Sequence, residues 1–244
     1  MAMRVQLQPC FVLHRREYRN SSLILEVFSA EYGRVGLVAR GVRSARSQSN
    51  ALLQAFQPLL ISWSGRGDLY TLTHVEAAEF VPPLSGHSYA SAYYLTELIM
   101  RLLQRMDAHT ELFTLYANAI ACLRIDGGDK LAAERNLRLF EKHLLEELGY
   151  GLVLDHDVNS GEVLQPEQEY CYVPEHGPVL KTPAALQNGP IVHGSSLIAL
   201  ANGELGDGNS LRDCKRLMRT ILQGYIGDKP LQSRMLYTSN HVPK

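Results

Sequence analysis

Apolar and polar positions alternate in short runs over the first third of the chain, a pattern typical of β-strands separated by turns. Gly33 separates two of the runs and suits the left-handed position of a tight hairpin turn. Several runs are apolar on both sides, as in the wall of a small closed barrel, where strand edges disappear. The predicted strands lie at 10–15, 22–29, 34–40, 56–64 and 69–80.

Helical spacing replaces this pattern after the break "VPPLSGH" at 81–87. Apolar residues then recur every three to four positions over 92–106, 112–123 and 137–148. Such spacing predicts three amphipathic helices, and Gly149 is suited to end the third. Short connections between them indicate a helical bundle.

Residues 149–183 lose the helical rhythm and indicate an irregular or β-rich insert, after which helical spacing returns at 195–202 and 211–225. We therefore expect an α+β protein, in which an N-terminal five-stranded oligonucleotide-binding (OB) β-barrel precedes an α-helical bundle that the insert interrupts. The expected domains are 1–80 for the barrel, 81–152 for the first part of the helical domain, 153–183 for the insert and 184–244 for its second part.

Positive charge is concentrated in the barrel region, although the net charge of the whole chain is only −1. Residues 1–79 hold nine basic side chains against six acids, and all nine are arginines. Arginine presents a flat fork of donors that matches phosphate and can stack on bases. This region is therefore predicted to contact a polyanion, with a solvated surface as the alternative.

The densest group lies in "ARGVRSARSQSN" at 39–50, where three arginines occur within seven positions without an acid. Gly41 leaves room for a ligand to approach the backbone. Contacts to phosphate set affinity rather than sequence choice. The predicted DNA-binding residues are Arg15, Arg16, Arg19, Arg34, Arg40, Arg43, Arg46 and Arg66.

Aromatic side chains are candidates for stacking on unpaired bases. In the barrel region these are Tyr18, Tyr32 and Trp63, each of which could instead be a packing residue. Aromatic residues are sparse, at 8% of the chain, so charge is expected to dominate binding.

Catalytic motifs are weak in this sequence. It contains no phosphate-binding G-x-x-x-x-G-K-[ST] loop, and "HGSS" at 193–196 lacks the spacing of a serine-hydrolase elbow. Asp155 and Asp157 could form the acid pair of a metal-dependent nuclease, or could be solvated turn residues. We expect no enzyme activity, no cofactor and no metal.

The location of the protein is predicted from what its sequence lacks. No run of about 18 apolar residues occurs, so no membrane-spanning helix is expected. The N-terminal segment has no long apolar centre of a signal peptide. The four cysteines lie more than 40 residues apart and form no framework, which agrees with a reducing compartment. We expect a cytoplasmic protein.

Four segments together resemble the RecO family, the bacterial mediators of the RecFOR recombination and repair pathway. They are "FVLHRREYRNSSLILEVFSAEYGRVGLVARGVRS", "LLQAFQPLLISWSGRGDL", "LRLFEKHLLEELGYG" and "KPLQSRMLY". The resemblance implies an OB barrel that binds single- and double-stranded DNA and anneals complementary strands. It also implies contacts with RecR and with the tail of the single-stranded-DNA-binding protein, and indirect promotion of RecA loading near the nucleoid.

The same resemblance implies a tail-binding site on the third helix, at Arg138 with Leu137 and Phe140. A cation beside an apolar groove would pair the terminal carboxylate of an acidic tail and bury its phenylalanine ring. The alternative is an ion pair of Arg138 with Glu134 or Glu141, at helical spacing.

One departure concerns the insert, which in some RecO relatives binds zinc through four cysteines. Here it contains His156, Cys171 and His176, widely spaced. Zinc sites use four ligands, commonly in closely spaced pairs. The insert at 153–183 is therefore predicted to be a degenerate zinc-finger-like element held by packing.

The sequence as a whole favours a non-enzymatic mediator of DNA repair and recombination. Two alternatives stay open. One is an OB-fold interaction module that binds protein and never DNA. The other is a nuclease that uses Asp155 and Asp157.

Overall fold

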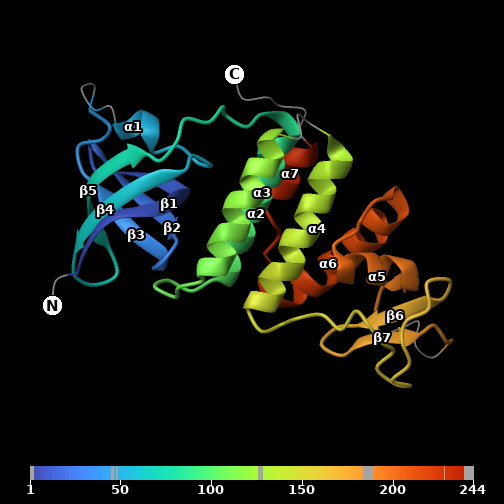
Figure 1. The fold of residues 1–244 in the computed structure, drawn as a ribbon. Helices are drawn as coiled ribbons and strands as arrows, with labels where there is room; N and C mark the ends of the chain where they lie inside the picture. The colour runs from blue at the N-terminus through green and yellow to red at the C-terminus, as the bar shows by residue number, and fades with distance from the viewer. Residues whose placement is uncertain are drawn as a thin grey trace. The chain divides into compact units, whose positions relative to one another are not determined.

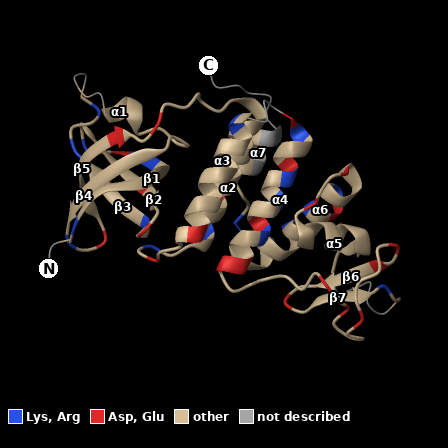
Figure 2. Ribbon diagram, viewed as in Figure 1, with Lys and Arg blue, Asp and Glu red and all other residues tan. Residues whose placement is uncertain are grey.

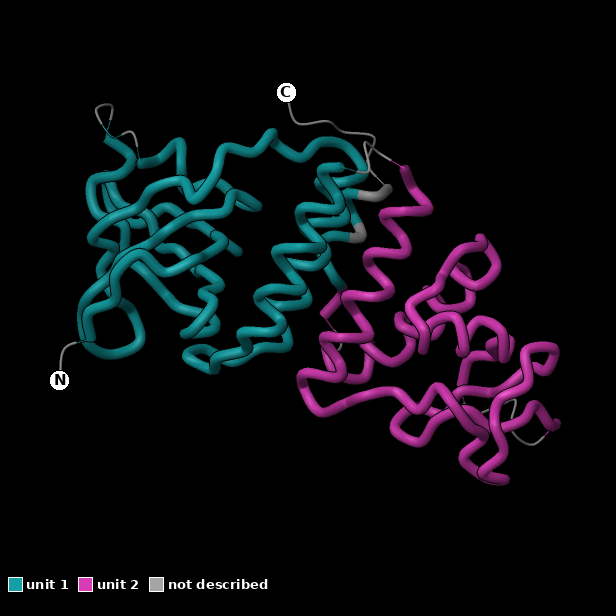
Figure 3. The backbone as a smooth tube through the Cα atoms, viewed as in Figure 1, with its two compact units in different colours: residues 1–125, 231–244 teal, residues 126–230 magenta. Residues whose placement is uncertain are grey.

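The structure is a computed structural model of the 244-residue chain. Two compact units make up the chain, one formed by 1–125 with 231–244 and the other by 126–230, coloured teal and magenta in Figure 3. The first unit contains the barrel and the second contains the insert. The residues that the structure describes are 3–44, 47, 49–125, 129–183, 189–227 and 229–238.

Five strands close into a barrel in the first unit (Figure 1). Their order around the barrel is β1-β2-β3-β5-β4, and β3 with β5 is the parallel pair. This topology confirms the predicted α+β fold with an N-terminal five-stranded OB barrel. The strands are β1 (Met3–Tyr18), β2 (Ser22–Ser29), β3 (Gly33–Ala39), β4 (Leu59–Gly65) and β5 (Tyr70–Ala77).

β1 serves two neighbours because it is 16 residues long. Its first half pairs with β4 and its second half with β2. The pairing is irregular between Val5 and Gln8 and again between Val12 and His14. Such bulges bend a strand and increase its twist, which allows β1 to follow the curve of the barrel. A short helix, α1 (Ser49–Leu52), lies between β3 and β4.

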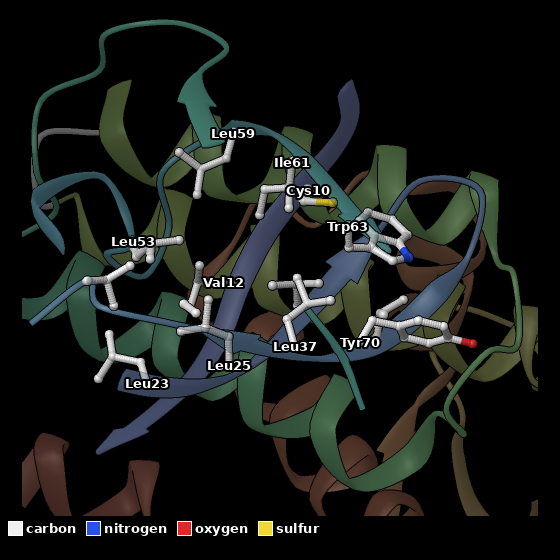
Figure 4. Packing of buried hydrophobic residues seen from close by; sticks show 14 of the residues in the cluster. Cys10, Val12, Leu23, Leu25, Leu37, Leu53, Leu59, Ile61, Trp63 and Tyr70 are labelled. Carbon is white, nitrogen blue, oxygen red and sulfur yellow. The ribbon is translucent and has the colours of Figure 1, made fainter. Parts of the chain in front are cut away.

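Alternate side chains of the strands fill the inside of the barrel (Figure 4). Leu25 and Leu37 lie opposite each other on β2 and β3 and are fully buried, as is Trp63 of β4. Gly33 has a φ of +63°, the left-handed conformation that its position predicted. A Cβ atom at Gly33 would also lie 1.7 Å from the carbonyl oxygen of Asp107, so a larger residue is excluded twice over.

Helices α2 (Gly86–Leu102) and α3 (Thr110–Ile125) belong to the same unit as the barrel. Phe11 of β1 and Phe28 of β2 pack against Phe113 and Tyr116 of α3, with ring centroids between 5.2 and 6.0 Å apart. The structure thus groups these helices with the barrel, whereas the sequence analysis placed them in a helical domain from residue 81.

The chain returns to the first unit through α7 (Ser233–Thr238). The carboxylate of Glu97 on α2 accepts hydrogen bonds from the backbone N–H groups of Gln232 and Ser233, each at 2.9 Å. These N–H groups lie at the start of α7 and have no partner within the helix. Glu97 therefore fixes where α7 begins.

The second unit combines three helices with a small sheet. Asp129 and Asp207 cap α4 and α6 by accepting backbone N–H groups of the first turn. Gly149 follows the end of α4 with a φ of +80°, as predicted. None of the described helices has both the length and the apolar character needed to cross a lipid bilayer. The elements are α4 (Lys130–Glu147), β6 (Glu169–Val173), β7 (Gly177–Leu180), β8 (Ile191–His193), α5 (Gly194–Asn202) and α6 (Gly208–Ile226).

Candidate nucleic-acid interface

Strand pairing assigns the arginines of the barrel to different faces. Residues that lie opposite each other on neighbouring strands point to the same face of a sheet. Leu25 belongs to the interior cluster, so Arg15, which pairs with it, lies on the inner side of β1. Arg16 pairs with Ile24, the residue next to Leu25 on β2. Neighbouring strand residues point to opposite faces, so Arg16 lies on the outer face. Figure 2 shows basic positions on several strands and turns of the barrel rather than in one cluster.

The outer face of β1, β2 and β3 has a half that α3 covers, at Phe11 and Phe28, and a half that stays open. In the open half, Arg16, Ile24 and Val38 form one cross-strand row. Tyr18 lies two residues beyond Arg16, and Arg40 directly follows the inward-facing Ala39. Both arginines are exposed, and the three uncharged residues are partly buried. We call Arg16, Tyr18, Ile24, Val38 and Arg40 the open face.

Arg34 does not belong to this surface, because its guanidinium is engaged by groups of the protein itself, and its prediction as a DNA contact stays untested. Its Nε and Nη2 donate to Oε1 of Glu26 at 3.1 and 2.8 Å. Its Nη1 donates to the carbonyl oxygens of Met100 and Leu103, at the end of α2, at 2.8 and 2.6 Å. Arg105 holds the other oxygen of Glu26 at 2.5 Å, and this hydrogen bond raises the pKa of Arg105. The side chain of Arg34 is 12% exposed, so its role is to join barrel and helix.

The loop after β3 lies against the turn between β1 and β2. The backbone N–H of Arg43 donates to the carbonyl oxygen of Ser21 at 2.9 Å, and its Nη1 donates to that of Arg19 at 3.3 Å. The guanidinium of Arg43 also pairs with Glu17 at 2.8 Å, so a phosphate there must compete with a carboxylate. Arg19 is exposed and lies over the ring of Tyr18, 5.1 Å from its centroid. Arg19 therefore borders the open face, and Arg43 is partly neutralised.

Two further predicted contacts have different outcomes. Arg15 is exposed, but its Nη1 donates to the carbonyl oxygen of Leu53 at 3.4 Å, on the side of the barrel away from the open face. Arg46 lies outside the described residues, so its prediction stays untested.

Arg66 lies in the turn between β4 and β5 and is exposed. This turn approaches the outer side of β3 closely at Gly36, where a Cβ atom would lie 3.1 Å from the carbonyl oxygen of Asp68. Gly36 is two residues before Val38 on the same side of β3. The turn that carries Arg66 therefore borders the open face. The 40–44 loop borders the same face at the other end of β3.

The three candidate stacking residues are separated by burial. Trp63 is fully buried inside the barrel, and Tyr32 packs edge-on against it with ring centroids 5.4 Å apart. These two are packing residues. Tyr18 lies on the open face, where a base could reach its ring.

Sequence analysis missed the apolar centre of the open face, Ile24 and Val38. Its signal was the lack of strict alternation in "SLILEVFS" and "RVGLVA", where outward positions are apolar. Partly buried apolar side chains between cations are unusual on a strand that faces water. They make this half of the outer face a candidate ligand-binding surface.

The predicted tail site on α4 is not exposed in the structure. Arg138 is 4% exposed, and Leu137 and Phe140 are each 3% exposed. The Nη2 of Arg138 donates to Oε1 of Glu141 at 2.7 Å, and Glu134 lies 3.9 Å from its Nη1. The alternative interpretation, an ion pair at helical spacing, is the one that the structure contains. An acidic tail would have to displace Glu141 to reach Arg138, and the prediction of Arg138 as the tail contact stays untested.

Comparison with known proteins decides the family. Residues 3–81 match the family described as recombination protein O N terminal, and residues 84–235 match recombination protein O C terminal. The chain belongs to the recombination protein O family.

Its relatives in this family are similar along nearly their full length, and three of them are each described as DNA repair protein RecO. The protein from Nitrosococcus oceani is 48% identical over 96% of this chain and 93% of its own length. That from Alkalilimnicola ehrlichii is 47% identical over 96% and 91%. That from Coxiella burnetii is 42% identical over 97% and 99%.

The insert of this RecO-family chain keeps its three zinc-type side chains in different surroundings. Cys171 is buried on β6, and its Sγ donates to the carbonyl oxygen of Gly189 at 3.5 Å. His156 is partly buried and hydrogen bonds to Asp155, and His176 is exposed in the turn after β6. Within the described residues, no group of three or more His, Cys, Asp or Glu side chains is arranged to hold a metal ion.

Asp157 is the polar centre of the insert. Its Oδ1 accepts the backbone N–H groups of Asn159 and Ser160 at 2.8 and 2.9 Å, and its Oδ2 accepts that of Leu180 at 2.6 Å. Burial raises the pKa of Asp157, but these three donors together with the Ser160 side chain more than offset burial and lower it below the usual value. Asp155, in contrast, is exposed and engaged by its neighbour His156. The two carboxylates therefore have different structural roles, and within the described residues neither belongs to a group of three or more His, Cys, Asp or Glu side chains that could hold a metal ion.

Proposed function

We propose that this chain is a non-enzymatic mediator of DNA repair and recombination whose barrel binds single- and double-stranded DNA through the open face. The observation that carries the proposal is the cross-strand row of Arg16, Ile24 and Val38, with Arg40 on its far side. Cations at both borders suit two phosphate groups, while the apolar centre and Tyr18 suit sugars and bases. Membership in the recombination protein O family, and the names of its relatives, support the same role.

Strand annealing follows from charge on this surface. The guanidinium groups of Arg16, Arg19, Arg40 and Arg66 neutralise phosphates on two strands and reduce the repulsion that keeps complementary strands apart. No nucleotide is consumed in this step. Contacts made through phosphate act on any sequence, as a mediator requires.

The partners that we propose are those that the family resemblance implies. They are RecR, the acidic tail of the single-stranded-DNA-binding protein, and RecA through RecR, in the RecFOR pathway of the bacterial cytoplasm. Arg138 is buried, so we expect tail binding to use another part of the chain.

Reversing the charge of the open face tests the proposal. In the double variant Arg16→Glu, Arg40→Glu we expect affinity for a single-stranded oligonucleotide to fall about 10- to 100-fold at low salt, because two attractive phosphate interactions become repulsive. The slope of log affinity against log salt should fall by about one for each phosphate that the variant no longer neutralises. Fluorescence anisotropy with DNAs of several sequences measures both quantities.

The matched control is Arg212→Glu, Arg219→Glu, an equal change of charge at two exposed positions of α6. We expect it to keep affinity within about twofold, since these two positions are not part of the open face. An equal fall in affinity in both variants would mean that net charge, not the open face, governs binding. Wild-type protein that binds no DNA at low salt would support the alternative of a protein-interaction module.

Tyr18→Ala tests whether a base stacks on the open face. Stacking on an aromatic ring contributes about 1–3 kcal/mol per base, so affinity for single-stranded DNA should fall about 5- to 100-fold. Bases inside a duplex are already stacked, so affinity for double-stranded DNA should change far less. Tyr18→Phe, which keeps the ring, is the control. An equal fall in affinity for both DNA forms in Tyr18→Ala would contradict stacking.

A further inference from the structure

A hollow of about 350 Å³ lies within the second unit, away from the barrel's open face in sequence and in chemistry. Its wall comes from three places along the chain: the segment 149–153 after α4, the end of β6 with the following turn, and the last turns of α6. The volume is in the range of pockets that hold a small ligand or a single large side chain. Three tyrosines, Tyr150, Tyr172 and Tyr225, supply most of its chemistry.

Two of the tyrosines form a ready platform. The rings of Tyr150 and Tyr225 are stacked with centroids 4.3 Å apart and planes at 28°, and Tyr150 is 48% exposed. Tyr172 is buried. Burial raises its pKa to about 12, although a hydrogen bond with the Val153 backbone acts to lower it. Its ring therefore stays neutral and presents π-electron density rather than charge. Such faces attract cations.

The hollow is lined by one carboxylate and one imidazole, and by no strongly basic side chain. Among the described lining residues these are Glu175 and His176, and there is neither lysine nor arginine. Burial and then the nearby Glu175 raise the pKa of Tyr225, which agrees with a negative potential at the platform. Helices α4 and α6 both end beside the hollow, since Gly149 and Tyr225 line it. The carboxyl end of a helix carries partial negative charge and favours cations.

Close backbone packing builds the hollow in advance of any ligand. A Cβ atom at Gly177 would lie 2.7 Å from Cγ1 of Val158 and 3.0 Å from the Cβ of Val153. The turn that carries Glu175 is therefore pressed against the 149–153 segment. Gly149 and Gly151 line the hollow without side chains that could fill it. The site needs little rearrangement to accept a guest, which lowers the entropy that binding must overcome.

We infer that this hollow binds the guanidinium group of an arginine side chain that a partner protein presents in an exposed segment. A flat guanidinium can stack on the Tyr150–Tyr225 pair while its N–H groups reach Glu175 and the helix-end carbonyl oxygens. Lysine offers a compact ammonium that is more strongly hydrated and does not stack in this way. The lining offers a carboxylate but no lysine or arginine that could pair with phosphate, which disfavours nucleic acid here, so the occupant is a protein segment.

The probe for this site is the peptide acetyl-Gly-Arg-Gly-amide, titrated into the full chain. Backbone amide resonances of Gly149 and Gly151 should shift in a saturable manner, while that of Gly67 in the barrel should not. The matched peptide with citrulline replaces the cation by a neutral group of the same shape. It should bind about tenfold more weakly or not at all.

Variants separate the parts of the site. Tyr150→Leu should weaken the arginine peptide about tenfold, and Tyr150→Phe should keep its affinity. Glu175→Gln should weaken it about threefold and reduce its dependence on salt. DNA binding by Tyr150→Leu should equal that of wild type, so failure of this site is distinguishable from failure of the open face.

Three results would overturn the inference. Equal affinity for the citrulline peptide would show that charge is not recognised. Shifts of Gly149 and Gly151 with spermidine but not with the arginine peptide would make the hollow a small-molecule site. The same shifts with a short single-stranded oligonucleotide would make it part of a nucleic-acid surface.

Discussion

Arg34→Ala is expected to lower the free energy of unfolding of the barrel unit by about 3 kcal/mol, the usual effect of breaking a buried ion pair. The change leaves Glu26, which is 5% exposed, with Arg105 as its remaining cation. It also removes the Nη1 group of Arg34, which donates to the carbonyl oxygens of both Met100 and Leu103 at the end of α2. A buried carbonyl oxygen without a donor has lost its hydrogen bond to water and makes none within the protein, which lowers stability.

Urea denaturation measures this destabilisation, followed by tryptophan fluorescence. The chain has one tryptophan, Trp63, which is buried inside the barrel and therefore reports on the barrel unit alone. Arg16→Ala is the control, because Arg16 is an exposed arginine of the same outer face, and its stability should change by less than about 0.5 kcal/mol.

DNA affinity gives the opposite ranking for the same two variants. Arg16→Ala should weaken binding, and folded Arg34→Ala should bind like wild type. If Arg34→Ala is as stable as wild type and binds DNA poorly, then Arg34 faces a ligand rather than a helix. The two variants together thus test whether the outer face has one half that binds DNA, with Arg16, and another half that packs against a helix, with Arg34.

Sequence periodicity predicted the barrel well because its strands are local. Four of the strands are short runs with their own turn signals, whereas β1 begins at Met3, seven residues before its predicted start. Gly33 has the φ that its position between two runs requires. Helical stretches were equally local, down to the end of α4 before Gly149. These features depend on neighbours in sequence, so one chain is enough to predict them.

The faces of the strands could not be predicted in the same way. Cys10 and Val12 point into the barrel, and strict alternation would place His14 and Arg16 inside as well. The bulge between Val12 and His14 shifts this order by one residue, so that Arg16 points outward. A one-residue shift moves every later side chain to the other face. The bulge leaves no recognisable mark in the sequence.

Two of the predicted arginine contacts have partners that are distant in sequence or buried. Arg34 has Glu26 only eight residues before it, but the carbonyl oxygens of Met100 and Leu103, to which it also donates, lie 66 and 69 residues away. Arg138 has Glu141 at helical spacing, so the pair itself was visible as an alternative. What the sequence did not reveal is that both side chains are buried.

Asp157→Ala is expected to destabilise the insert by about 3 kcal/mol, because three backbone N–H donors lose one acceptor group. These donors belong to the turn at 159–160 and to Leu180 at the end of β7, so Asp157 joins two parts of the insert. In this chain a buried carboxylate performs the cross-linking that a bound metal performs elsewhere. Asp155→Ala is the control, since Asp155 is exposed and its removal should change stability by less than about 0.5 kcal/mol.

Acid provides an independent test of the same residue. The pKa of Asp157 is lowered in the folded chain, so the unfolded chain takes up a proton first as the pH falls. Its stabilisation is complete above the ordinary carboxyl pKa of about 3.9 and is lost as the pH falls through the lowered folded value. Hydrogen exchange at the Ser160 and Leu180 amides should accelerate over that window in wild type. In Asp157→Ala the same amides should exchange rapidly at neutral pH and show little further change on acidification.

Asp157→Asn separates charge from geometry. Its amide oxygen can still accept the Asn159 and Ser160 N–H groups, while its NH₂ group faces the N–H of Leu180 and cannot accept from it. Protection should therefore persist at Ser160 and fall at Leu180. If both amides stay protected in Asp157→Ala as well, the insert is held by the packing of buried side chains such as Tyr172, and the carboxylate is incidental.

If cleavage of DNA with magnesium or manganese occurs in wild type and vanishes in both Asp155→Ala and Asp157→Ala, the two acids act together after all, and the mediator assignment must yield to the nuclease alternative.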